Sequence, residues 1–422
     1  MISLRRSFIG TTGLQFFCTG LSVISGIIYA RYLGPEQYGL YGYIMSIIGV
    51  ALLPVIAGLP TLLIREIASY QLDKKWGLLR GLFNWSLLYV IITSAFSISI
   101  IYIVILHGGF GVEIASLLWI ALLLIPLKGL LSQQSACLTG FKKPILALFP
   151  GQLLPPSITL LFILTFVFIN EELSVYKLIE FAVYSSVIAF LFSSYLLYRA
   201  FNKKTKVEKL EYRVKTWLYT LLPFSLMMFI GTLNSELATI VLGWFNDYES
   251  VAYFKVALQA VALVSLGLNS INGVIMPHIA QSYREGDMIK TQKLVTKSVR
   301  VSSTIALPIL LALIFFGDVL IEMLFGSDFV KSYPLIIILS IGQLVNVLMG
   351  SVGVILNMTG NERASLKALV ISFIINVIFM IILIPMYGAI GAAISVSIGL
   401  IIWNVLMSID VYRLMGICSF FK

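Results

Sequence analysis

Runs of about 20 consecutive, mostly apolar residues recur from one end of this 422-residue chain to the other. A helix of about that length crosses the hydrocarbon layer of a bilayer, which is roughly 30 Å thick. Only 11% of the residues are charged, whereas an ordinary soluble domain has about a quarter. The chain therefore has too few polar side chains to cover a water-facing surface. The pattern predicts an all-α polytopic membrane protein.

The apolar runs predict twelve membrane-spanning helices. The last two are separated by a very short connector at 387–388, so the count depends on that break. No connector is long enough to hold a soluble catalytic domain, so any chemistry must lie in the membrane. Together with the duplicated halves of the chain, this predicts a transporter and not an enzyme. The twelve spans are placed at about 8–31, 38–60, 82–106, 114–138, 145–169, 178–200, 217–245, 250–276, 298–321, 334–358, 364–386 and 389–412.

The basic residues are distributed unevenly over the connectors. Of the 29 Lys and Arg, 24 fall at the N-terminus or in every second connector, and only Arg31, Lys177 and Lys331 fall on the opposite side. Because Lys and Arg are enriched in cytoplasmic loops, this asymmetry predicts that both termini are cytoplasmic. The first apolar run follows Arg5 and Arg6 but lacks a small-residue cleavage site, so we expect an uncleaved span and not a secretory signal.

Several kinds of chemistry lack the residues they need. The cysteines Cys18, Cys137 and Cys418 are far apart, and His107 and His278 have no ligand partners at metal-binding spacing. The net charge of +10 resides in connectors, which argues against nucleic acid as a partner. No GxxxxGK[ST] loop occurs, so ATP hydrolysis is not expected. The sequence predicts neither a metal nor a cofactor.

The chain divides into two similar halves. The most polar stretch, 202–216, lies at the midpoint and is expected to link an N-terminal six-helix lobe, 1–201, to a C-terminal one, 217–422. Ile67-Ala68 recurs as Ile279-Ala280 at an offset of 212, and Leu138-Thr139-Gly140 recurs as Met358-Thr359-Gly360 at an offset of 220. An even number of spans in each half predicts pseudo-symmetry about an axis along the membrane normal, as in duplicated transporters.

The segment Ala30–Tyr41, with the sequence ARYLGPEQYGLY, follows a first span rich in small and polar residues. It resembles the signature of Wzx-type O-antigen and polysaccharide flippases, which belong to the multidrug/oligosaccharidyl-lipid/polysaccharide exporter superfamily. The Thr-Gly pairs after the fourth and tenth spans fit the same pattern. The resemblance implies a MATE-like fold of two six-helix lobes. It also implies transport of undecaprenyl-diphosphate-linked oligosaccharide, for O-antigen lipopolysaccharide or for capsule, across the bacterial inner membrane, with a polysaccharide polymerase and a chain-length regulator as partners.

A diphosphate that crosses the membrane needs cations along its path, and a charged side chain at bilayer depth is costly unless it has a partner or a wet cavity. Lys128 lies near the middle of the fourth span with Ser132 one turn further along. It is expected to line the cavity, the alternative being a lysine tied to backbone carbonyls freed by Pro126.

The eighth span carries the second candidate cation, Lys255. Gln259 and Asn269 continue its face at helical spacing, which favours a substrate-binding role over simple snorkelling to the headgroups. Gln15 lies on a comparable polar stripe of the first span.

Glu236 is the one carboxylate expected well inside a span. Two roles remain open for it: an ion pair with Lys255, or a site that couples transport to protons or cations. Two other functions fit the sequence less well. A cation-coupled drug exporter of the same fold would favour a more acidic cavity than Lys128 and Lys255 provide. A membrane polysaccharide polymerase or ligase would need a larger outer loop.

Overall fold

The computed structural model describes residues 2–169, 172–200, 209–245 and 247–419. The side chains of 2–12, 223, 227, 266–274, 276 and 277 lie outside the described set. Within these ranges the chain forms helices joined by short turns and no strand. Among the described residues, ten helical stretches are long and apolar enough to cross a membrane, which confirms the predicted all-α membrane fold.

The chain forms two compact units, comprising residues 1–33 with 44–236 and residues 34–43 with 237–422. The division falls inside one helix, between Glu236 and Leu237, and segment 34–43 groups with the second unit. The predicted linker 202–216 lies mostly outside the described residues, so the lobe boundaries drawn from the sequence stay a prediction.

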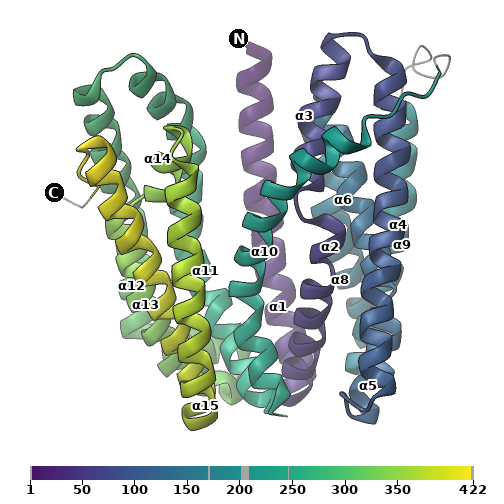
Figure 1. Cartoon of the computed structure of the whole chain (residues 1–422). Helices are drawn as coiled ribbons and strands as arrows, with labels where there is room; N and C mark the ends of the chain where they lie inside the picture. The colour runs from purple at the N-terminus through teal and green to yellow at the C-terminus, as the bar shows by residue number, and fades with distance from the viewer. Residues whose placement is uncertain (1, 170–171, 201–208, 246, 420–422) are drawn as a thin grey trace. The chain divides into compact units, whose positions relative to one another are not determined.

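The first unit contains most of the first nine helices and the larger part of the tenth. Figure 1 shows α3, α4, α6, α8 and α9 running side by side in one bundle. The elements are α1 (Ile2–Ala51), α2 (Leu53–Ile56), α3 (Leu59–Leu72), α4 (Trp76–Leu106), α5 (Val112–Ala121), α6 (Leu124–Gly140), α7 (Pro144–Leu148), the π-helical turn η1 (Phe149–Leu153), α8 (Leu154–Phe168), α9 (Val175–Ala200) and α10 (Val214–Trp244).

Helix α6 is the centre of the first unit, because it packs against α3, α4 and α9. Two glycines permit close approach of α6 to α2 and α3. A Cβ on Gly129 would lie 2.5 Å from a methyl group of Val55 in α2, and one on Gly140 would lie 2.9 Å from Ile67 in α3. Small residues at such contacts are how helices associate in membranes, where no hydrophobic force draws them together.

The second unit is built from the remaining long helices, in which α13 packs against α15 and α12 packs against both α11 and α13. Its core includes Ile279, Val295, Leu356, Met407 and Val411. The elements are α11 (Tyr248–Arg284), α12 (Met288–Phe325), the 3₁₀ turn η3 (Ser327–Ser332), α13 (Tyr333–Met349), α14 (Val352–Met358) and α15 (Glu362–Met415).

Two pairs of predicted spans are each joined in one kinked helix. The backbone of α1 breaks at Gly34, with φ 70° and ψ 173°, directly before Pro35. That of α15 breaks at Gly388, with φ 54° and ψ −129°. Both breaks lie in connectors expected from the sequence, at 32–37 and 387–388. Positive φ values favour glycine, which explains why these residues stand at the kinks.

Other predicted spans are interrupted where the chain carries proline or glycine. The run 38–60 breaks near Pro54 and Gly58, and the run 334–358 breaks at Gly350, whose φ is 70°. The run 145–169 becomes α7, η1 and α8, with prolines in the first turn of each element. These spans are therefore not single continuous helices, because proline lacks the N–H that continues a helix.

Four helix ends share one turn geometry. After α3, the N–H of Lys75 bonds to Tyr70 O at 2.9 Å around Lys74, whose φ is 58°. After α11, 212 positions later, Asp287 bonds to Ser282 O at 3.1 Å around Gly286, whose φ is 74°. Both turns are Schellman caps. The offset of 212 found in the sequence is thus repeated in the backbone.

The second pair of turns corrects the sequence match at offset 220. Lys143 N bonds to Leu138 O around Lys142, and Asn361 N bonds to Leu356 O around Gly360. Lys142 and Gly360 have φ values of 60° and 79° and lie 218 positions apart. The offset between the turns is therefore two residues shorter than the offset between the two Thr-Gly pairs. The sequence match misses this because the left-handed position is Gly in one turn and Lys in the other.

Candidate functional site

The carboxylate of Glu236 is held by a residue from the second predicted span. Ser46 Oγ in α1 donates a hydrogen bond to Glu236 Oε2 in α10 at 2.6 Å, and Ser46 is completely buried. Gly49 lies one turn further along α1, where a Cβ would come within 3.7 Å of Glu236 Cγ. The serine hydroxyl and the bare backbone at Gly49 together form the seat of the carboxylate.

Lys128 is the second charged group of this region. It lies in α6 two residues after Pro126, its side chain is half-buried, and the Glu236 carboxylate is close enough for its charge to act on the ammonium group. Ser46, Gly49, Lys128 and Glu236 form what we call the Glu236 cluster. Opposite charges at similar depth offset part of each other's desolvation cost, which explains why both can occupy the membrane.

The neighbours of Lys128 on α6 include polar residues that the sequence analysis did not single out. Ser132, a predicted site residue, is half-buried. Gln133 and Gln134 are buried, and their amide groups donate to Ser86 Oγ at 2.7 Å and Ser194 Oγ at 2.8 Å. Two consecutive glutamines inside an otherwise apolar run were the signal for these buried contacts.

The predicted site residues of the eighth span fall in the second unit. Lys255 and Gln259 are half-buried in α11. The stem of Lys255 packs on segment 34–43, since a Cβ on Gly42 would lie 3.3 Å from Lys255 Cγ. The side chain of Asn269 lies outside the described residues. Gln15 is exposed on α1 in the first unit, and its backbone oxygen accepts a 3.0 Å hydrogen bond from Thr19.

The structure thus brings Lys128 together with Glu236, a pairing that the sequence does not suggest. One expectation from the sequence instead pairs Glu236 with Lys255, because these two residues occur on consecutive spans. Glu236 and Lys255 belong to different units, and their pairing stays a prediction. Nothing in the linear sequence relates positions 46, 128 and 236, since their proximity arises from the packing of α1, α6 and α10.

The described residues contain no group of three or more His, Cys, Asp or Glu side chains placed to bind a metal ion. The three cysteines are free thiols. The arrangement of the Glu236 cluster suits ionic recognition and proton exchange within a membrane.

Two curated relatives are similar in sequence. The chain is 27% identical over 217 residues to the capsular polysaccharide biosynthesis protein CapF of Staphylococcus aureus, a match that covers 50% of this chain and 55% of that protein. It is 23% identical to a protein of Haloferax volcanii named "Probable low-salt glycan biosynthesis flippase", over 96% of this chain and 83% of that protein.

Two solved structures share the fold. An inward-facing multidrug resistance MATE family transporter of the MOP superfamily has a TM-score of 0.78 at 15% identity, covering 94% of each chain. The lipid II flippase MurJ, in an inward closed conformation, has a TM-score of 0.75 at 18% identity, covering 96% of this chain and 87% of that one. The predicted MATE-like fold is confirmed.

The prediction of a transporter and not an enzyme is in line with the names of these proteins, since both solved structures are transporters or flippases and a relative that matches nearly the whole chain carries a flippase name. The family model described as polysaccharide biosynthesis protein matches residues 4–283, well over half of the chain. The chain belongs to the polysaccharide biosynthesis protein family.

Proposed function

We propose that this protein is a flippase that moves a lipid-linked oligosaccharide from the cytoplasmic to the outer leaflet of the membrane by alternating access. Three things support the proposal: membership of a polysaccharide biosynthesis family, a fold shared with MurJ, and the Glu236 cluster inside the membrane. The cluster is the observation that carries it, because a lysine at this depth offers a charge to a diphosphate that has left water.

In this proposal, the protonation state of Glu236 controls whether the charge of Lys128 is available to the substrate. While the carboxylate is ionised, it competes with substrate for the ammonium group of Lys128. When Glu236 takes up a proton, the competing charge is removed and Lys128 is available to the diphosphate. Ser46 keeps the carboxyl group oriented in both forms, since a hydroxyl can donate to a carboxylate or to a carboxyl oxygen. Exchange of this proton between two facing states would couple transport to a pH gradient.

The same proposal includes the identity of the substrate, the partner proteins, the membrane and the topology. The substrate is an undecaprenyl-diphosphate-linked repeat unit of O-antigen or capsule, and a polymerase and a chain-length regulator act on the product. The protein resides in the inner membrane with both termini cytoplasmic, as the 24-to-3 charge split of the sequence favours. Reporter fusions within 202–216 and at the C-terminus test the topology, and an outer location of either would contradict it.

The decisive experiment exchanges Lys128 in a strain that depends on this protein for surface polysaccharide. Lys128→Ala should reduce the polymer at least about tenfold, the loss expected when one ionic contact to phosphate is removed. Lys128→Arg should retain part of it, because the charge remains while the geometry differs. Lys297→Ala, which changes an exposed lysine of α12, is the matched control.

Protein abundance in the membrane must be equal in the three variants for the comparison to count. Wild-type polysaccharide in the Lys128→Ala strain would refute the role of this lysine. The same strain also separates the alternative function: a cation-coupled drug exporter would leave surface polysaccharide unchanged and would alter resistance to cationic drugs instead.

A further inference from the structure

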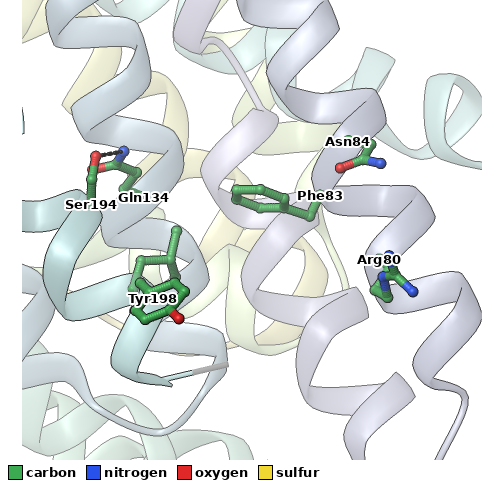
Figure 2. A pocket seen from close by; sticks show the side chains of 7 residues that line it. Arg80, Phe83, Asn84, Gln134, Ser194 and Tyr198 are labelled. Atoms are coloured by element: carbon green, nitrogen blue, oxygen red, sulfur yellow. Dashed lines mark hydrogen bonds between the residues drawn. The ribbon is translucent and has the colours of Figure 1, made fainter. Parts of the chain in front are cut away.

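A pocket lies in the first unit, and it contains none of the residues of the Glu236 cluster. It has a volume of about 280 Å³ and lies where α4 and α9 both flank α6. Figure 2 shows Ser194, Gln134 and Tyr198 on one side of it and Phe83, Asn84 and Arg80 on the other.

The pocket contains an acceptor that the protein does not satisfy. The Gln134 side chain is only 6% exposed, and its amide nitrogen donates to Ser194 Oγ at 2.8 Å. Its Oε1 atom, which is fully buried, has no hydrogen-bond partner in the protein. Buried acceptors in native proteins are normally paired, so this carbonyl is free to take a donor in the pocket if the amide group turns toward it.

A cation lies on the opposite wall of the same pocket. Arg80 is in the second turn of α4 and is half-buried, and Asn84 is one turn further along. A guanidinium group recognises phosphate through paired N–H donors, and an amide adds a further donor. The pocket therefore combines a phosphate-binding side with a side that accepts a hydrogen bond.

The topology expected from the sequence puts the pocket at the level of the cytoplasmic lipid headgroups. It lies near the start of α4 and the end of α9, the ends that the charge asymmetry of the sequence assigns to the cytoplasm. From there toward the membrane centre, both helices present exposed apolar side chains, among them Leu88 and Ile91 on α4 and Leu191 on α9. Acyl chains would cover these residues.

We propose that this pocket binds the headgroup of an anionic phospholipid that carries hydroxyl groups, with phosphatidylglycerol as the simplest example. Arg80 binds the phosphodiester, and a glycerol hydroxyl donates to Gln134 Oε1 once the amide group turns toward the pocket. Phe83 and Tyr198 enclose the headgroup between them. The volume suits a glycerophosphate group and is too small for an oligosaccharide, which separates this site from the transport path. Basic pockets between membrane helices on the cytoplasmic side are known as lipid headgroup sites.

The test measures lipid binding to the purified full-length protein by native mass spectrometry. The probes are phosphatidylglycerol, phosphatidylmethanol, phosphatidylcholine and inorganic phosphate. Phosphatidylmethanol has the same phosphodiester charge as phosphatidylglycerol but no hydroxyl group, so the pair isolates the donor to Gln134. We expect the wild-type protein to prefer phosphatidylglycerol to phosphatidylmethanol, and either to phosphatidylcholine.

Each side of the pocket has its own variant. Arg80→Ala should weaken both anionic lipids about tenfold, the size expected for a charge-assisted contact. Gln134→Leu should remove the preference for phosphatidylglycerol while binding of phosphatidylmethanol persists. Gln134→Glu keeps the shape and adds a negative charge, and it should weaken both lipids, which keeps the test decisive if the leucine variant fails to fold. Arg413→Ala, an exposed arginine at the end of α15, is the matched control.

Unchanged phosphatidylglycerol binding in folded Arg80→Ala and Gln134→Leu proteins would overturn the proposal. So would displacement of the lipid by an equal concentration of inorganic phosphate, which would identify a free-anion site. Because the readout is lipid binding, failure of this proposal leaves the flippase proposal standing, and the converse also holds.

Discussion

The hydroxyl of Ser46 donates a 2.6 Å hydrogen bond to Oε2 of Glu236 across 190 positions of the chain. The serine is completely buried on α1, and the glutamate lies on α10 next to the boundary between the two units. A carboxyl group held in this way keeps a fixed orientation, with Lys128 near enough to respond to its charge. This contact is therefore the first place to test the proposed mechanism.

Removal of the hydroxyl should cost stability because the contact is buried. Ser46→Ala is expected to lower the free energy of unfolding by about 1.5–3 kcal/mol, the range for a hydrogen bond to a charged group. In Glu236→Gln an amide oxygen can still accept from Ser46, so a smaller loss is expected. The two changes should be non-additive in the double variant, since they remove parts of one interaction. Denaturation in detergent measures the free energy of unfolding of the wild-type protein, the two single variants and the double variant.

Ser99→Ala is a suitable control for this series. The Ser99 hydroxyl makes only a local bond to Ala95 O within α4 at 2.8 Å and is exposed. A surface change of this kind should shift stability by no more than about 0.5 kcal/mol. Strictly additive effects of the Ser46 and Glu236 changes would show that the bond does not exist in the membrane protein.

The coupling role of Glu236 predicts a separate effect on transport. Glu236→Gln retains the shape of the side chain but fixes it in the neutral form. In reconstituted vesicles it should abolish the dependence of flipping on a pH gradient and strengthen binding of a diphosphate lipid, because the charge competing for Lys128 is gone. A fluorescent lipid-linked oligosaccharide reports both quantities.

A different pattern would assign Glu236 a structural role. Suppose that Glu236→Gln keeps the pH dependence of the wild-type protein while Lys255→Ala alone destabilises the protein. The glutamate would then serve as the ion-pair partner of Lys255, and the coupling proposal would fail. Wild-type flipping rates measured without any gradient provide the reference for both variants.

The membrane fold was predictable because hydropathy acts locally: each apolar run must cross the bilayer as a helix. Interruptions within spans were only partly predictable. Pro54 and Gly350 indicate that a helix can break, but whether it breaks, kinks or continues depends on the helices packed beside it. The sequence also predicts two separate spans where the structure has one helix, α1, kinked at Gly34. Hydropathy marks the polar connector between the spans but does not show that the helix continues through it.

The candidate site was predictable in its components but not in its partnerships. Lys128 and Glu236 stand out because charge is costly at bilayer depth. Ser46 gives no such signal, because a serine among apolar residues more often bonds to its own helix. The partner of Glu236 follows from the crossing of α1 and α10, and that crossing is set by long-range packing.

The matched turns allow a last prediction in which the two halves of the chain serve as each other's controls. Lys74 and Lys142 occupy left-handed positions, with φ of 58° and 60°, where Gly286 and Gly360 stand in the corresponding turns. A non-glycine residue there costs roughly 1–2 kcal/mol, while glycine adds about 0.5–1 kcal/mol of unfolded-state entropy. Lys74→Gly and Lys142→Gly should therefore stabilise the protein by about 0.5–1 kcal/mol each.

Lys143→Gly, at a neighbouring exposed residue with φ of −119°, should destabilise the protein, because there is no strain to relieve. Gly286→Lys and Gly360→Lys should lower stability by about the amount that the first two changes gain. Thermal unfolding of the five variants in one detergent tests the set, and a stabilising Lys143→Gly would show that loss of positive charge, and not backbone conformation, governs these turns.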